Sequence, residues 1–189
     1  MLPEQLPLSP GAFTTAAAVR NAGRGASETR ICIARGLPSI FLFADPGARR
    51  LRGFNLFDGW AEEDDRGPVF HLTSVGALGD HRLTLGNRAL LDHREHGRAL
   101  HLFAADGPSG SPVDPVRQRY LGEFLVDPTE PHLERRAPAL GPGNRTRRVF
   151  VFRLRPVPGR PFQHDDRDGT ATPEEHAAAA ARTWFVSYR

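Results

Sequence analysis

Residues 79–91 read Gly-Asp-His-Arg-Leu-Thr-Leu-Gly-Asn-Arg-Ala-Leu-Leu and carry the strongest local pattern of this chain. Apolar residues recur in this stretch at helical spacing. Asp80 can cap the N-terminus of a helix, and Gly97 can end it. The pattern therefore predicts a helix over residues 80–96 that lies across a sheet.

Short apolar runs alternate with turn-forming residues on both sides of this helix. Six runs predict strands, at residues 30–34, 39–44, 68–73, 99–104, 119–126 and 147–154. Residues 149–152 are apolar on both faces, which indicates a central strand. Further helices are predicted at residues 12–21 and 172–181, with a terminal strand or docking segment at 183–188. The predicted fold class is α+β, mainly β: a partly open curved β-barrel with two or three flanking helices.

The length of 189 residues, 39% of them hydrophobic, fits one globular domain. We expect a lead-in and short helix over residues 1–25, the main domain over 26–158, and a linker, helix and strand packed on it over 159–189. The chain contains neither a run of 18 apolar residues nor a basic N-terminal region, so a cytoplasmic protein without a membrane partner is expected. Cys32 lies in an apolar run and is predicted to be buried.

All 25 basic residues are arginines, and their distribution is uneven. Residues 61–134 hold 7 arginines and 13 acidic residues, whereas residues 135–189 hold 11 arginines and 5 acidic residues. Guanidinium groups suit phosphates and base edges. A basic last third beside an acidic middle therefore indicates a polyanion-binding face.

Three stretches together resemble the SRA (SET- and RING-associated) domain family, which reads modified cytosine in DNA. They are residues 58–65 (Asp-Gly-Trp-Ala-Glu-Glu-Asp-Asp), residues 70–76 (Phe-His-Leu-Thr-Ser-Val-Gly) and residues 79–91. Residues 97–103 and 120–124 look like the bacterial branch, whose members are often fused to an HNH nuclease. The resemblance spans roughly residues 35–155 and implies an SRA/PUA-like barrel that swings one nucleotide out of the duplex.

The resemblance also implies a base pocket. An extruded cytosine needs flat or apolar walls, an acceptor for its exocyclic amine and backbone donors for its carbonyl. The residues that match these roles are Trp60 as a wall, Glu63 as the acceptor with Asp64 and Asp65 as neighbouring alternatives, Leu72, and the turn formed by Thr73, Ser74 and Gly76. Leu72 stands where the family usually has a second aromatic residue, which predicts weaker binding unless Phe57 or Phe70 rotates into its place.

The arginines that we expect to contact the DNA backbone lie in three groups. They are Arg30, Arg35, Arg49, Arg50 and Arg52 on early loops, Arg82 and Arg88 near the motif helix, and Arg135, Arg136, Arg145, Arg147 and Arg148 late in the chain. Phosphate contacts of this kind fix the register of a protein on DNA without reading its sequence.

The sequence thus predicts a non-enzymatic reader of double-stranded DNA that contains 5-methylcytosine or 5-hydroxymethylcytosine, acting in recognition of, or defence against, methylated DNA. No cofactor is expected, and no metal, because His93 and His96 lack a third spaced ligand. A nuclease partner in trans and a homo-oligomer are both compatible with the sequence. Two alternatives stay open: a metal-dependent nuclease using Glu62, Glu63, Asp64 or Asp65, and a reader of a modified RNA base or a phosphorothioate linkage.

Overall fold

The computed structural model describes residues 8–23, 30–46, 57–76, 79–106, 116–139 and 146–164. The helix and strand predicted beyond residue 171 lie outside these residues, as do Arg49, Arg50, Arg52 and Arg145.

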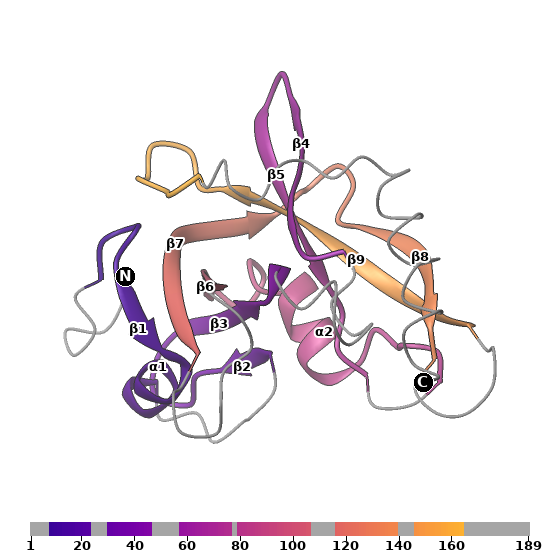
Figure 1. Ribbon diagram of the computed structural model, residues 1–189, viewed down its shortest axis with the longest axis horizontal. Coiled ribbons are helices and arrows are strands. Elements are labelled where there is room, and N and C mark those ends of the chain that lie inside the picture. The colour runs from indigo at the N-terminus through magenta and orange to yellow at the C-terminus, as the bar shows by residue number, and fades with distance from the viewer. Residues whose placement is uncertain are drawn as a thin grey trace, which may run out of the picture.

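Nine strands and two helices make up the described part of the chain (Figure 1). In chain order they are β1 (Phe13–Thr15), α1 (Ala16–Ala22), β2 (Ile31–Ile33), β3 (Ser39–Ala44), β4 (Gly59–Asp64), β5 (Gly67–Thr73), α2 (Leu85–Leu91), β6 (Ala99–Asp106), β7 (Arg117–Val126), β8 (His132–Pro138) and β9 (Thr146–Pro156). The strands form one mixed sheet in the order β2-β3-β6-β7-β9-β5-β4, with β1 paired to β7 and β8 paired to β9. Only the β3–β6 pair is parallel among the named strands.

The sheet curls around one main core. The two ends of the strand order, β2 and β4, are not paired with each other, yet Ile31 of β2 and Trp60 of β4 belong to the same buried cluster. A flat sheet would hold these strands far apart, so the shared cluster requires strong curvature. The mainly β fold class and the partly open curved barrel are therefore confirmed.

A second core lies under α1 and holds Cys32, Phe41, Phe103 and Tyr120. Cys32 is fully buried, as predicted. The expected central position of residues 149–152 is also confirmed, because β9 pairs with β5 on one edge and with β8 and β7 on the other.

The structure corrects the predicted helices. The motif helix is short: α2 begins after Thr84, and the carboxylate of Asp80 instead accepts a hydrogen bond from the backbone N–H of Arg148, at 2.7 Å. The first helix begins only at Ala16, because residues 13–15 pair with β7 as strand β1. Hydrogen bonds between the loop at residues 80–81 and Arg148 of β9, and pairing of residues 13–15 with β7, thus override the local helical pattern. Neither described helix is long and apolar enough to cross a bilayer.

Besides β1, strands β4 and β8 lie outside the six predicted runs. Their sequences are charged and do not show the apolar alternation that predicts a strand. In β8, Glu134, Arg135 and Arg136 are exposed, as suits a strand with one edge unpaired by the named strands. In β4, Glu62 and Asp64 are offset by arginines of β9, which the sequence pattern does not reveal.

Candidate nucleic-acid site

Strands β4 and β5 form a hairpin that projects from the sheet, and an irregularity in it decides which side chains share a face (Figure 1). Trp60 pairs with Phe70 and Glu62 pairs with Val69, so that the register shifts between Trp60 and Glu62 and Ala61 is the extra residue. Such a bulge reverses the alternation of side chains in one strand relative to its partner.

The bulge places Glu63 on the same face as Trp60. Directly opposed residues share a face: Trp60 is opposite Phe70, and Glu63 is opposite Pro68, two residues along the same face of β5. In a regular strand, residues three apart would point to opposite faces. We call the face that carries Trp60, Glu63, Phe70 and Leu72 the inner face. Glu63 is exposed there, about 7 Å along the hairpin from Trp60.

Trp60 itself is buried, with 2% of its surface exposed. Its indole meets Phe70 edge-on at 5.3 Å between ring centroids and Phe124 at 5.9 Å. His164 stacks on it at 4.4 Å with an interplanar angle of 28°. Trp60, predicted as a wall of the base pocket, is thus a buried residue of the main core, with His164 stacked on its indole.

Leu72 lies on the side of the Trp60–Phe70 pair away from Glu63, because β5 runs from Pro68 through Phe70 to Leu72. Leu72 and Phe70 are both 0% exposed within the main core. Phe70 and Leu72 are therefore both packed in the core, and neither side chain is accessible to a base that binds beside Glu63.

The turn after β5 is held by buried polar groups, Asp58 first among them. Asp58 is 0% exposed, and its carboxylate accepts hydrogen bonds from the N–H groups of Thr73 and Asp45, at 2.9 Å each, and forms an ion pair with Arg30. Arg30 also donates to the carbonyl oxygen of Thr73 at 3.2 Å. A buried carboxylate bound in this way fixes the start of β4 against the end of β5.

Asn87 of α2 clamps the same turn. Its side chain accepts from the Val75 N–H at 3.0 Å and donates to the carbonyl oxygens of Val75 and Arg82 at 2.8 Å each. This explains the asparagine of the 79–91 stretch as a structural residue. The N–H of Ser74 donates to Phe150 at 2.8 Å. The N–H groups of residues 73–75 are thus all engaged within the protein, so they are not open to the carbonyl of a base in this conformation.

His81 packs against the turn that follows β5. Its Nδ1 lies 2.6 Å from the Ser74 hydroxyl, and its ring would collide with a Cβ at Gly76, at 2.4 Å. Burial, and next the charge of Arg147, lowers the pKa of His81 to about 4, so the ring is neutral at pH 7. The glycine at this position is required by the close approach of the imidazole.

The opposite, outer face of the hairpin carries a network of ion pairs. Arg155 binds Asp64 with both terminal nitrogens, at 2.9 and 2.6 Å, and its Nε donates to Asp127 at 2.7 Å. The guanidinium of Arg155 holds the pKa of Asp64 well below its usual range. Arg153 forms an ion pair with Glu62 in the same network. Asp64 and Glu62 are therefore structural, on the face away from Trp60.

The hairpin carboxylates give no support to a metal centre. Within the described ranges, no group of three His, Cys, Asp or Glu side chains could hold a metal ion. Glu63 and Asp65 form no ion pair with another described residue, and both are exposed.

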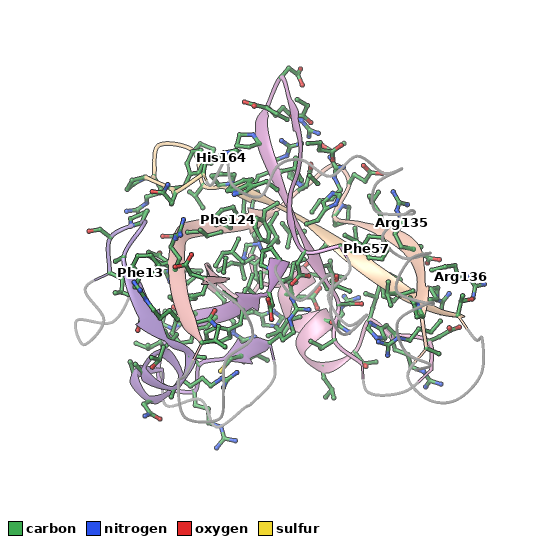
Figure 2. All side chains as sticks on the ribbon, in the orientation of Figure 1. Phe13, Phe57, Phe124, Arg135, Arg136 and His164 are labelled. Carbon is green, nitrogen blue, oxygen red and sulfur yellow. The ribbon has the colours of Figure 1, made fainter. Side chains whose placement is uncertain are left out.

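The predicted phosphate-binding arginines fall into two classes. Arg35, Arg82, Arg88, Arg135, Arg136 and Arg148 are exposed. Arg147 is only 2% exposed and reaches the Gly76 carbonyl at 3.4 Å, while Arg30 is bound to Asp58. These two arginines bind groups of the turn or its supports; Arg147 is buried and Arg30 is half-buried. Figure 2 shows Arg135 and Arg136 together on β8, on the other side of the β4–β5 hairpin from His164.

Sequence reasoning missed Asp58 and His164. Asp58 begins the quoted stretch 58–65, but a single aspartate before a glycine is typical of a turn, and only its burial reveals its role. His164 lies about 100 residues from Trp60 in the chain, and no local pattern links them.

The family model of the ScoMcrA-like SRA domain matches residues 25–171. The chain belongs to the SRA domain family, ScoMcrA-like type. The resemblance read from the three sequence stretches is thereby confirmed. No curated protein matches the chain significantly.

Solved structures share the SRA fold with this chain. The sulfur-binding and SRA domains of ScoMcrA complexed with phosphorothioated DNA are 21% identical to it, with a TM-score of 0.53, over 93% of this chain and 46% of that one. The SRA domain of SUVH5 in complex with methylated CHH DNA is 17% identical, with a TM-score of 0.51, over 86% and 97%. KRYPTONITE in complex with mCHH DNA, an H3(1-15) peptide and SAH is 16% identical, with a TM-score of 0.55, over 89% and 36%. The SRA chain thus spans about half of the ScoMcrA fragment.

Proposed function

We propose that this SRA domain is a non-enzymatic reader of 5-methylcytosine, and also of 5-hydroxymethylcytosine, in double-stranded DNA. It extrudes the modified base and holds it on the inner face of the β4–β5 hairpin. The observation that carries the proposal is the bulge at Trp60–Glu62, which brings an indole and an exposed carboxylate to one face. The relatives support it, because SUVH5 and KRYPTONITE form complexes with methylated DNA.

The chemistry of cytosine assigns the two side chains different tasks. The indole of Trp60 provides a flat apolar surface that offsets part of the stacking lost on extrusion, about 1–3 kcal/mol per base. The carboxylate of Glu63 accepts a hydrogen bond from the exocyclic amine, which thymine lacks. The methyl group adds only about 0.8 kcal/mol, or roughly fourfold in affinity, by burial of one carbon.

The exposed arginines hold the duplex while the base is out. Arg135 and Arg136 on β8, with Arg82 and Arg88 near α2, contact phosphates without reading bases. We propose that the bound domain recruits or assists a nuclease in trans in defence against modified DNA. ScoMcrA, a phosphorothioation-dependent restriction endonuclease, joins such a fold to cleavage in one chain.

The test compares Glu63→Ala with Asp65→Ala, two exposed carboxylates of one hairpin of which only Glu63 is placed on the inner face. Affinity is measured by fluorescence anisotropy for duplexes with one 5-methylcytosine, one 5-hydroxymethylcytosine, one phosphorothioate linkage or no modification. We expect wild type to prefer the 5-methylcytosine duplex over its unmodified twin by about fourfold or more. Loss of a charge-assisted hydrogen bond in Glu63→Ala weakens binding about 10- to 100-fold, and Asp65→Ala leaves it within about twofold.

Equal binding of the methylated and unmodified duplexes by wild type would overturn the proposal. Tighter binding of the phosphorothioate duplex than of either cytosine-modified duplex would identify the sulfur-containing linkage as the ligand instead.

A further inference from the structure

The segment that follows β9 returns to the inner face and covers the indole of Trp60. Phe162 forms an isolated bridge with Gly122 of β7, and the N–H of Gln163 donates to the carbonyl of Leu121 at 2.8 Å. These two contacts fix the segment beside the base of the hairpin. His164 is the next residue along the chain (Figure 2).

The anchor depends on the absence of a side chain at Gly122. Its φ of +128° is a conformation that L-residues avoid, and a Cβ there would lie 3.0 Å from the Pro161 carbonyl oxygen and 3.2 Å from Phe162. The return of the segment is thus built into β7, independently of any contact that His164 makes.

The imidazole of His164 lies where a base would stack. The core side of the indole is closed by Phe70 and Phe124, both at most 1% exposed. His164 stacks on the indole at 4.4 Å and 28°, whereas it is itself exposed. Carbon atoms in contact are about 3.5–4.0 Å apart, so a ring cannot enter between the two residues in this arrangement.

We propose that His164 is a placeholder for the extruded base: its imidazole covers Trp60 in the free protein and swings away when the base binds. The inference rests on the proposed function, because it takes Trp60 as the stacking surface. His164 lies just beyond the anchor at Phe162 and Gln163, so rotation of its side chain opens the face of the indole on which it stacks. Phe162, whose ring centroid lies 6.1 Å from that of Trp60 at 50°, stays with the anchor. The free protein thereby avoids exposing a large apolar ring, and each binding event must break this stack.

The test uses His164→Ala, with His96→Ala as the matched control, because His96 is an exposed histidine outside the candidate site, on the turn that follows α2. Trp184→Phe is added to the wild type and to both variants, so that Trp60 is the one tryptophan of each full chain. Acrylamide quenching without DNA then reports whether the indole is covered. We expect stronger quenching in His164→Ala and no change in His96→Ala.

Affinity for a duplex with one 5-methylcytosine is the second measurement. Removal of the competing stack in His164→Ala is expected to tighten binding about three- to tenfold, which corresponds to roughly 0.7–1.4 kcal/mol. His164→Trp, which offers a larger stacking surface, is expected to weaken binding. Unchanged or weaker binding by His164→Ala would overturn the placeholder, and weaker binding would make the imidazole a wall of the bound base.

The two proposals fail in different ways. Equal binding of methylated and unmodified duplexes by wild type overturns the proposed function, and the placeholder with it. Selective binding by wild type together with unchanged quenching in His164→Ala leaves the reader intact and overturns the placeholder alone.

Discussion

Replacement of Asn87 by alanine is predicted to destabilise the protein through the turn that follows β5. The side chain is 2% exposed and makes three hydrogen bonds of 2.8–3.0 Å to main-chain groups. Alanine leaves one N–H and two carbonyl groups without these partners. A buried main-chain group without a partner costs about 1–3 kcal/mol, and part of this turn can be reached by water. We therefore expect the free energy of unfolding to fall by about 2–4 kcal/mol.

The measurement is urea unfolding followed by circular dichroism, with thermal unfolding as a second assay. For a domain of this length, the expected loss corresponds to a Tm lower by roughly 5–15 °C. Arg88→Ala is the matched control: Arg88 is the next residue of α2, is exposed, and pairs with Asp92 at 2.5 Å. Removal of that i, i+4 pair costs about 0.3–0.5 kcal/mol.

Asn87→Asp keeps the size of the side chain but removes the amide N–H groups that donate hydrogen bonds, so it separates these two contributions to stability. A carboxylate can still accept from Val75, but it faces the two carbonyl oxygens to which the amide donates. We expect it to be no more stable than Asn87→Ala. The reasoning is refuted if Asn87→Ala and Arg88→Ala unfold within about 0.5 kcal/mol of each other.

Three further predictions follow from buried groups. Burial lowers the pKa values of His81 and His101 to about 4, below the unfolded value near 6.5. The folded state therefore resists protonation, and the free energy of unfolding should be constant above pH 6.5 and fall by at most about 3 kcal/mol per histidine as pH drops to 4; a flat urea midpoint over this range contradicts it. Gly122→Ala should cost about 1–3 kcal/mol in urea unfolding and increase acrylamide quenching of the indole, because its φ of +128° and the docked segment exclude a Cβ; wild-type quenching would argue against the anchor. Arg155→Met leaves the fully buried carboxylate of Asp127 without its closest guanidinium and should cost about 3–5 kcal/mol by the same unfolding assay; a loss below 1 kcal/mol would show that the ion pairs of the outer face are dispensable.

Part of the fold could be predicted because several strands have a recognisable local sequence pattern. β3, β6, β7 and β9 are apolar runs bounded by turn residues, and each lies within two or three residues of its predicted bounds. β4 and β8 escaped prediction because their charges are offset by partners distant in the chain, such as Arg155 for Asp64. A local sequence pattern predicts a strand only where the buried side chains are themselves apolar, and not where charged side chains are neutralised by residues distant in the chain.

For the candidate site too, the sequence showed some of the residues, whereas their contacts appear only in the tertiary structure. The motif residues Asp80, His81 and Asn87 were visible in the sequence, but their task of holding the turn after β5 appears only when residues 80–87 are placed against that turn and against Arg148 of β9. Arg147 looked like a surface cation and is buried, because alternation along β9 turns it toward Ala137 and Val149. Charge alone therefore does not locate a phosphate contact.

The sequence by itself determined the fold class and the family, since these follow from patterns of neighbouring residues. Only the tertiary structure decided which carboxylate accompanies Trp60. One extra residue in β4 reverses the side-chain alternation and brings Glu63, not Glu62 or Asp64, to the inner face. It also decided that His164 covers the indole, because the return of the chain over Gly122 is a long-range contact that no local pattern encodes.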